Sequence, residues 1–358
     1  IGVRLVGSEM CIRDSYKVFI MSIFDYCVSN PPYQQKIQRK TQKNSNTATI
    51  NIFDKLHLTT LYYSVNTIMI YPAGRWWYDI KSPLRKYLFT NHYLKELTYY
   101  DSKQSRNIFP TVGIADGINI IHTTAYYNSS YTIKNNIISY TTSNWSIVKP
   151  LPINATHCAL ADKILSKIKQ LQLDTLDTIT TFPQNQAGLS SKQLSELHLE
   201  KYSHQELSDN QLKIFANASG SISGKSDYYL IDKEMIRKYD HTYQVCFRQT
   251  IIENSNRRWF ITLFDNTTVY GNSSVLLYKN TDYEQAYYFS KYAETKFFEY
   301  CIRLNIEGRK KVLGSYTPVF NNYCSNSLID FTQSIDSQLY ELFDLTDNEI
   351  MLIENCGV

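Results

Sequence analysis

The stretch Phe24-Asp-Tyr-Cys-Val-Ser-Asn-Pro-Pro-Tyr33 is the most informative part of this 358-residue chain. Its first six residues form a short apolar run, and Pro31 and Pro32 lack the backbone N–H groups that a sheet ladder needs. The run is therefore predicted to be a buried strand that stops at Asn30. In α/β sheets ligands bind at the carboxyl ends of strands, so residues 30–33 stand where a site is expected.

On either side of this stretch, helix and strand patterns alternate up to about residue 145. Residues 34–49 are polar and are predicted to be a mobile loop. Strands are predicted at residues 66–71, 94–100 and 118–127 and from residue 131, and helices at residues 52–63 and from Pro83, which Ser82 caps. This alternation predicts an α/β fold with βαβ units and a largely parallel sheet.

The alternation of helix and strand patterns ends after about Trp145, and Pro150 and Pro152 are predicted to lie in a linker. The second half is predicted to be α+β, with short strands through residues 228–278. Helices are predicted at residues 158–173, 281–304 and 334–343, after a capping box formed by Ser190 with Gln193, and after a cap formed by Thr346 with Glu349. No internal repeat is visible.

The amino-acid composition limits which classes of function are plausible for the chain. The net charge is only +4, so neither nucleic acid nor acidic small molecules are required as partners, and 12 glycines argue against Gly-rich phosphate loops. Seven cysteines without a C-x-x-C pair, and no apolar run of roughly 18 residues, favour a cytoplasmic protein. Six Asn-x-Ser/Thr triplets leave a secreted glycoprotein as an alternative, but no signal peptide precedes them.

The first fifteen residues are interpreted separately from the rest. The run Met10-Cys-Ile-Arg-Asp-Ser15 back-translates to ATG TGT ATA AGA GAC AGx, which looks like a transposon-end adapter used in sequencing libraries. Residues 1–15 are therefore expected to be a translated adapter, with a natural N-terminus as the alternative. On the adapter interpretation, the natural protein is a longer chain of which this is a C-terminal fragment.

The Asn30-Pro31-Pro32-Tyr33 tetrapeptide suits one reaction well. The exocyclic amine of adenine is a poor nucleophile because its lone pair is delocalised into the ring. The side-chain oxygen of Asn30 and the main-chain carbonyl of Pro31 can accept its two N–H bonds and free that lone pair. Tyr33 offers a ring face for a base swung out of its duplex. The alternative is a plain Pro-Pro turn with Tyr33 in the core.

Together with its surroundings, this motif resembles N6-adenine-specific DNA methyltransferases of type II restriction–modification systems, including fused nuclease–methylases. Further similar stretches are residues 68–77, 84–88, 94–101, 107–121 and 327–350. The resemblance implies S-adenosyl-L-methionine as methyl donor, double-stranded DNA with a flipped adenine as substrate, and Asn30, Pro31, Pro32 and Tyr33 as catalytic residues. It also implies a cognate or fused restriction endonuclease.

The resemblance assigns residues 16–145 to the C-terminal part of a Rossmann-like catalytic domain, and residues 150–358 to a DNA target-recognition region with a C-terminal helical tail. Phe109 is a candidate second stacking face for the base, or else a core residue beside Pro110. The basic residues Arg257, Arg258, Lys310 and Lys311 are candidate DNA contacts, with solvated surface as the alternative.

One departure from the family matters. Its donor site includes a Gly-containing loop upstream of the catalytic motif, and residues 16–30 do not supply one. The chain is therefore expected to lack most of the donor-binding half and not to methylate DNA by itself. A DNA-binding specificity module without catalysis, or a remnant of an enzyme, is the rival hypothesis.

Overall fold

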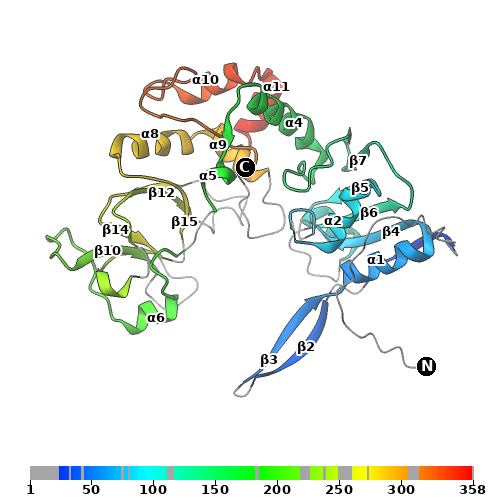
Figure 1. The fold of residues 1–358 in the computed structure, drawn as a ribbon, viewed down its shortest axis with the longest axis horizontal. Helices are drawn as coiled ribbons and strands as arrows, with labels where there is room; N and C mark the ends of the chain where they lie inside the picture. The colour runs from blue at the N-terminus through cyan, green and yellow to red at the C-terminus, as the bar shows by residue number, and fades with distance from the viewer. Residues whose placement is uncertain are drawn as a thin grey trace.

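The fold is mixed α/β and forms an arch. The computed structural model describes residues 24–31, 34–41, 44–73, 76–79, 81–110, 117–181, 185–217, 226–236, 239–248, 260–271, 274–304 and 314–356. A six-stranded sheet forms one end of the arch, two three-stranded sheets lie toward the other end, and the C-terminal helices lie between them (Figure 1). Within these ranges, no helix has the length and apolar character needed to cross a bilayer.

The six-stranded sheet has the strand order β1-β4-β6-β5-β7-β8. Its strands are β1 (Phe24–Ser29), β4 (Ser64–Pro72), β5 (Leu94–Tyr100), β6 (Ile118–Thr124), β7 (Tyr131–Lys134) and β8 (Ser139–Thr142). The pairs β1–β4 and β5–β7 are parallel, whereas β6 is antiparallel to both β4 and β5, and β8 is antiparallel to β7. The α/β class is confirmed, but the predicted largely parallel sheet is wrong, because this sheet is mixed.

The reversal of β6 follows from the short connection that precedes it. After β5 the chain forms α3 (Ser102–Ile108), and the hydroxyl of Ser105 accepts a hydrogen bond of 3.0 Å from the N–H of Ile118 at the start of β6. The connection thus re-enters the sheet at the edge where β5 ends. A strand that enters at that edge must run antiparallel to β5.

Helices cover one face of the sheet. Helix α1 (Phe53–Tyr63) packs on β4 and β6, where the imidazole of His57 lies 2.9 Å from the hydroxyl of Thr123. Helix α2 (Pro83–Thr90) begins at Ser82, whose hydroxyl accepts from the N–H of Arg85 as predicted. Rings from α2 and β7 meet on this face, with Phe89 and Tyr131 centroids 5.7 Å apart. This face therefore carries the core of the sheet.

The opposite face of the sheet is much more open. On β4 and β6 it presents Ile68, Ile70 and Ile120, which are half-buried. Paired beside them on β1, Tyr26 and Val28 are 57% and 72% exposed. The prediction that residues 24–29 form a strand is confirmed, but the prediction that this strand is buried is wrong. An apolar run can line an edge strand whose face has no neighbour, and periodicity does not distinguish the two cases.

Residues 34–49, predicted to be a loop, belong to a β-hairpin. Strands β2 (Gln34–Thr41) and β3 (Asn44–Asn51) pair antiparallel over eight residues each, and the hairpin projects from the sheet end of the arch (Figure 1). A two-stranded ribbon pairs half of its backbone groups across the ladder and leaves the rest to water, so both of its faces can be polar. Polarity alone was therefore a poor guide to structure here.

The second half contains two small sheets and several helices. The sheets have the orders β11-β10-β14 and β13-β12-β15. Their strands are β10 (Gln211–Ala216), β11 (Asp227–Asp232), β12 (Tyr243–Arg248), β13 (Ile261–Phe264), β14 (Thr268–Tyr270) and β15 (Ser274–Asn280), and the short strands β9 (Asp174–Thr175) and β16 (Pro318–Val319) pair with each other. The helices are α4 (Ala155–Gln170), α5 (Leu176–Ile179), α6 (Ser191–Glu196), α8 (Tyr283–Ala293), α9 (Lys296–Arg303), α10 (Ile335–Leu342) and α11 (Asp347–Glu354), with a 3₁₀ turn at Lys233–Met235.

The predicted single helix over residues 281–304 is in fact two helices. Helix α8 ends at Ala293, and Thr295 starts α9 by accepting a hydrogen bond of 3.1 Å from the N–H of Phe298. A threonine hydroxyl competes for backbone donors in this way, and an apolar periodicity does not report it. The predicted capping boxes at Ser190–Gln193 and Thr346–Glu349 are both confirmed.

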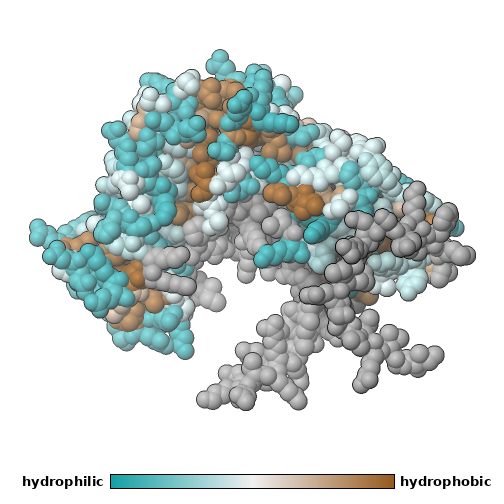
Figure 2. Space-filling model, viewed as in Figure 1, coloured by the Kyte–Doolittle hydropathy of each residue, from teal (hydrophilic) through white to brown (hydrophobic). Residues whose placement is uncertain are grey.

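One large core joins the six-stranded sheet to the C-terminal helices. It includes Trp77 after β4 and extends through residues 151–176 to α8–α11. The indole N–H of Trp77 donates to the carbonyl of Leu151 at 2.8 Å, and the hydroxyl of Tyr316 donates to that of Pro150. Packing is therefore continuous across the predicted linker. Figure 2 shows hydrophobic residues gathered over the top of the arch and over the end that carries β10 and α6.

Candidate active site

The carboxyl ends of β1, β4 and β5 lie along one edge of the six-stranded sheet. The strands β1 and β4 are parallel, and β6 is antiparallel to both β4 and β5, so all three run in the same direction. Helix α1 begins at this edge as well, because the hydroxyl of Tyr71, near the end of β4, donates to the carbonyl of Phe53 at 3.4 Å. The edge thus gathers strand ends and a helix N-terminus, where ligands bind in α/β sheets.

Two residues of the predicted catalytic motif lie at this edge. Asn30 follows the last residue of β1 and is exposed, and Pro31 is buried next to it. The carboxamide of Asn30 is therefore not enclosed in the core, as its predicted contact with a base requires. Pro32 and Tyr33 lie outside the described residues, so the predicted stacking by Tyr33 stays a prediction.

Phe109 lies at the same edge as Asn30. It is half-buried at the C-terminus of α3, which follows β5, and its N–H donates to the carbonyl of Ser105 at 2.8 Å. The hydroxyl of Ser105 in turn donates to the carbonyl of Tyr100 at 3.0 Å, which fastens α3 to the end of β5. The structure therefore brings Asn30, Pro31 and Phe109 to one edge of one sheet, although they are almost 80 residues apart in sequence.

Gly117 holds the connection between α3 and β6 close to this edge. Its φ is +78°, and a Cβ there would lie 2.3 Å from the carbonyl oxygen of Tyr100. Its own carbonyl accepts a hydrogen bond of 3.0 Å from the N–H of Ala73, just after β4. Only glycine fits such a position without a shift of the backbone, so the ends of β4 and β5 are tied together here.

Asp54 is a group at this edge that sequence reasoning missed. It lies in the first turn of α1, and one carboxylate oxygen accepts from the hydroxyl of Ser82 at 2.8 Å. The other oxygen, Oδ1, is buried without a hydrogen-bond partner among the described residues. Burial raises the pKa of this carboxyl. The sequence held only a weak signal, an acid at the third position of the helix predicted over residues 52–63, which follows the motif.

The loop after β4 is anchored by a tryptophan pair that the sequence shows but does not place. Trp76 and Trp77 are both fully buried, with ring centroids 5.4 Å apart. In the amide orientation that satisfies its neighbours, Asn119 accepts from the indole N–H of Trp76 at 2.8 Å and donates to the carbonyl of Tyr71. The end of β4 is thereby held rigidly against β6.

The predicted DNA-contact residues Arg257, Arg258, Lys310 and Lys311 all lie outside the described residues, so their assignment stays a prediction. Within the described ranges, no three histidine, cysteine or acidic side chains come together as a metal site. The described part of the edge therefore offers a carboxamide, peptide carbonyls, an aromatic ring and the carboxyls of Asp54 and Asp101. These groups can accept hydrogen bonds from an amine and stack on a planar ring.

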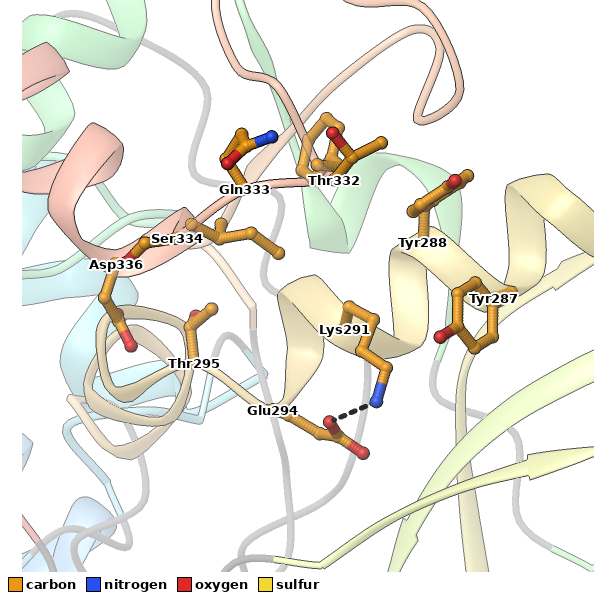
Figure 3. Close-up of a pocket in the computed structure, with 11 residues that line it drawn as sticks. Tyr287, Tyr288, Lys291, Glu294, Thr295, Thr332, Gln333, Ser334 and Asp336 are labelled. Atoms are coloured by element: carbon orange, nitrogen blue, oxygen red, sulfur yellow. Dashed lines mark hydrogen bonds and ion pairs between the residues drawn. The ribbon is translucent and has the colours of Figure 1, made fainter.

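Away from this edge, a hollow of about 550 Å³ lies between α8 and residues 331–336 (Figure 3). Its charged groups already have partners: Lys291 lies 3.3 Å from Glu294, and the carboxylate of Asp336 accepts from the N–H groups of Lys296 and Phe297. Burial raises the pKa of Asp336, while those N–H groups oppose the shift. Its polar groups thus hold the helices together.

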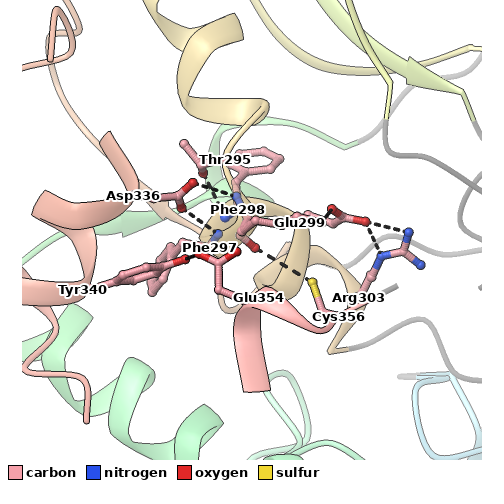
Figure 4. A network of polar contacts seen from close by, with 10 residues as sticks. Thr295, Phe297, Phe298, Glu299, Arg303, Asp336, Tyr340, Glu354 and Cys356 are labelled. Carbon is pink, nitrogen blue, oxygen red and sulfur yellow. Dashed lines mark hydrogen bonds and ion pairs between the residues drawn. The ribbon is translucent and has the colours of Figure 1, made fainter. Parts of the chain in front are cut away.

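Figure 4 shows how these contacts continue into the last helices. Tyr340 of α10 donates to Glu354 of α11 at 2.6 Å, and Arg303 lies 2.7 Å from Glu299 within α9. Asp336 of α10 caps α9 in the same network. Helices α9, α10 and α11 are therefore interlocked by polar contacts around a buried apolar centre.

Comparison of the chain with protein-family models and with curated protein sequences found no match.

Proposed function

We propose that this chain carries the methyl-acceptor half of a site-specific DNA methyltransferase of a restriction–modification system, acting on N6 of an extruded adenine. The observation that carries the proposal is the position of Asn30 and Pro31 at the carboxyl end of β1, with Asn30 exposed and Phe109 on the same sheet edge. Two acceptors and a ring at a sheet edge match what an adenine amine needs.

On this proposal each residue acts on the amine directly. The side-chain oxygen of Asn30 and the carbonyl of Pro31 accept the two N–H bonds and draw the nitrogen toward tetrahedral geometry. The same acceptors stabilise the positive charge that grows on nitrogen during transfer. Phe109 stacks on the base. The proton that the amine loses passes to solvent at this exposed edge; Asp54 lies at the same edge, but its Oδ1 is buried.

S-adenosyl-L-methionine, when bound, supplies the methyl group as a sulfonium. The described residues do not form a complete site for it. Among the described residues β1 is the outermost strand of its sheet, and Tyr26 and Val28 on its open face are exposed. In a mixed sheet one face can stay open, and here the open face carries the apolar side chains of Ile68, Ile70 and Ile120. The open apolar face is therefore where we place a donor-binding half, carried by another segment or another polypeptide.

The lack of a complete donor site among the described residues also favours a second candidate function, a DNA-binding specificity module without catalysis. Such a module would bind a defined duplex sequence through residues 150–358 and would not use the sheet edge. The two candidates differ in what Asn30 does once the duplex is bound.

The proposal is tested without a methyl donor. The purified chain is used to enrich bound duplexes from a random library, and the fluorescent base 2-aminopurine then replaces each adenine of the enriched site. We expect one adenine position at which fluorescence rises on binding, as the base leaves the stack, and a smaller rise with Asn30→Ala at unchanged duplex affinity. No enriched sequence would refute both candidates, and enrichment without any fluorescence rise would leave only the specificity module.

A second measurement addresses the donor. The purified chain with S-adenosyl-L-methionine and the enriched duplex is expected to give no N6-methyladenine by mass spectrometry of the nucleosides. Robust methyl transfer by this chain alone would contradict the placement of the donor site on another segment.

A further inference from the structure

A cleft lined by aromatic rings lies between the two small sheets, far along the chain from the candidate active site. We call it the aromatic cleft; its volume is about 630 Å³, within the usual range for small-ligand sites. The first sheet contributes Tyr228 and the neighbouring Tyr202, and the second sheet contributes Tyr243 and Phe264, with Tyr283 of α8 beside them. The rings therefore come from both sides of the cleft.

The charges in the aromatic cleft cancel. Lys201 lies 2.5 Å from Asp227, and Lys213 forms an ion pair with Asp265. The side chain of Lys213 is only 13% exposed, and its ammonium lies 5.4 Å from the centroid of the Tyr202 ring. Two neutralised pairs do not make a phosphate site. They leave donors and acceptors at the wall of a space bounded by aromatic rings.

The Asp265 carboxylate is fixed in its ionised form. Burial alone would raise its pKa, but hydrogen bonds from Lys213, Thr268 and Thr267 hold that pKa below its ordinary value. A carboxylate held in this way can accept a hydrogen bond from an amino group. The oxygens of Asp265 already accept from Lys213, Thr267 and Thr268, however, so the carboxylate with room for a ligand is that of Asp227, which accepts from Lys201 and from the N–H of Tyr228.

Gln244 adds an unsatisfied polar group to this region. It lies opposite Phe264 across the β12–β13 ladder and is therefore on the same face of the sheet. The residue is buried, and neither its Oε1 nor its Nε2 has a hydrogen-bond partner among the described residues. Buried amides are rarely left unpaired at both ends. Gln244 does not line the cleft itself but lies beneath its wall, next to Phe264.

We propose that the aromatic cleft binds a single unpaired nucleobase, at a site separate from the one that we assign to the reacting adenine. Tyr202 and Tyr228 stack on the base, Asp227 accepts from an exocyclic amino group, and the lysines donate to ring nitrogens or carbonyls. The choice of a nucleobase over another planar ring rests on the proposed DNA function. A cleft without net charge suits the base and not the phosphate.

The test uses the full chain and single-stranded DNA, with no methyl donor and no duplex. Fluorescence anisotropy compares a labelled mixed-sequence oligonucleotide with an abasic strand of the same length. We expect Tyr202→Ala to weaken binding of the base-containing strand about tenfold, which corresponds to the loss of one base–aromatic stack. Tyr202→Phe should keep the affinity, and neither variant should change binding of the abasic strand.

Tyr126→Ala is the matched control, because Tyr126 is an exposed tyrosine at the other end of the molecule. Tyr202 lies outside the named strands, so its replacement leaves every sheet ladder intact; circular dichroism checks this. Unchanged affinity with Tyr202→Ala, or equal losses for both strands, would overturn the inference. Either result would leave the duplex enrichment that tests the proposed function unaffected, and a failed enrichment would leave base binding by the cleft standing.

Discussion

The two ends of the arch are built on cores of different size. The six-stranded sheet shares one large apolar cluster with the C-terminal helices, and this cluster runs through residues 151–153. The sheet β11-β10-β14 instead packs on a small separate cluster that includes Leu194, Ile214 and Val269. Stability is expected to differ accordingly, because the few contacts of a small cluster allow it to open without the rest.

The difference in core size corresponds to the two sites proposed above. The candidate active site lies on the rigid end, where Gly117 and the tryptophan pair hold the strand ends in place. The aromatic cleft lies between two small sheets that share a buried cluster of Phe215, Cys246, Phe264, Tyr270 and Leu276, and one of these sheets also packs on the separate small core. A catalytic edge needs fixed geometry, whereas a base-binding cleft can adjust to its ligand.

The largest expected effect is that of Trp77→Ala. Its ring is fully buried in the large core and its N–H reaches Leu151, so removal should cost about 4 kcal/mol of unfolding free energy. Urea denaturation followed by circular dichroism measures this. Loss of the same magnitude with Tyr126→Ala, an exposed residue, would show that the effect is not one of packing.

Ile214→Ala should break the small core alone. The side chain is fully buried in β10, and truncation is expected to cost about 3 kcal/mol, felt locally. Hydrogen exchange should accelerate for amides of β10, β11 and β14 and stay unchanged for β4 and β6. Faster exchange in both regions would mean that the two cores unfold together, and it would contradict the expected difference in their stability.

His57 should make the sheet end sensitive to acid. It is fully buried under the sheet, and burial lowers its pKa to about 3, against 6.5 when unfolded. The unfolded chain therefore takes up a proton first as pH falls. The contribution of His57 to the free energy of unfolding is fully present above pH 6.5 and is lost as the pH falls from there to about 3. At pH 5 the loss is ~2 kcal/mol.

His57→Gln keeps a donor for Thr123 and should reduce this pH dependence between pH 6.5 and 5 without abolishing it, because burial also lowers the pKa of His157 to about 4. His241→Asn, which replaces an exposed histidine in the small-sheet end, serves as the control. A pH dependence of the same size in His57→Gln as in the parent would assign the acid sensitivity elsewhere.

The smallest effect concerns the contact between α4 and α11. Lys163 lies 2.6 Å from Glu349. Burial would raise the pKa of Glu349, but the hydrogen bonds from Lys163 and Thr346 keep it below the ordinary value of 4.5. The pair should stabilise the fold by ~0.5 kcal/mol above pH 4.5 and lose that contribution below it. Lys163→Met should thus differ from the parent at pH 7 and match it in strong acid.

Local features were predicted well because neighbouring residues determine them. The cap at Ser82 and the boxes at Ser190 and Thr346 require only a hydroxyl three residues before its partner N–H. The positions of β4, β5 and β6 followed from β-branched and aromatic runs. Of the candidate site, the sequence indicated Asn30, Pro31 and Phe109, and their common edge follows from the strand order.

Features that depend on distant contacts were missed. Asp54 accepts a hydrogen bond from Ser82, which is 28 residues away, and no sequence pattern near either residue predicts this contact. The reversal of β6 depends on where α3 returns the chain, and the aromatic cleft depends on how two sheets face each other. Each of these is a property of three-dimensional packing and not of spacing along the chain.

By itself, the amino-acid sequence determined the α/β class, most helix starts and strand positions, and a carboxamide followed by two prolines at a strand end. Only the tertiary structure decided that β1 is exposed, that the sheet is mixed, and that one core spans the predicted linker. The physical reason is range: backbone capping and side-chain periodicity act over a few residues, whereas burial depends on which surfaces meet after the chain has folded.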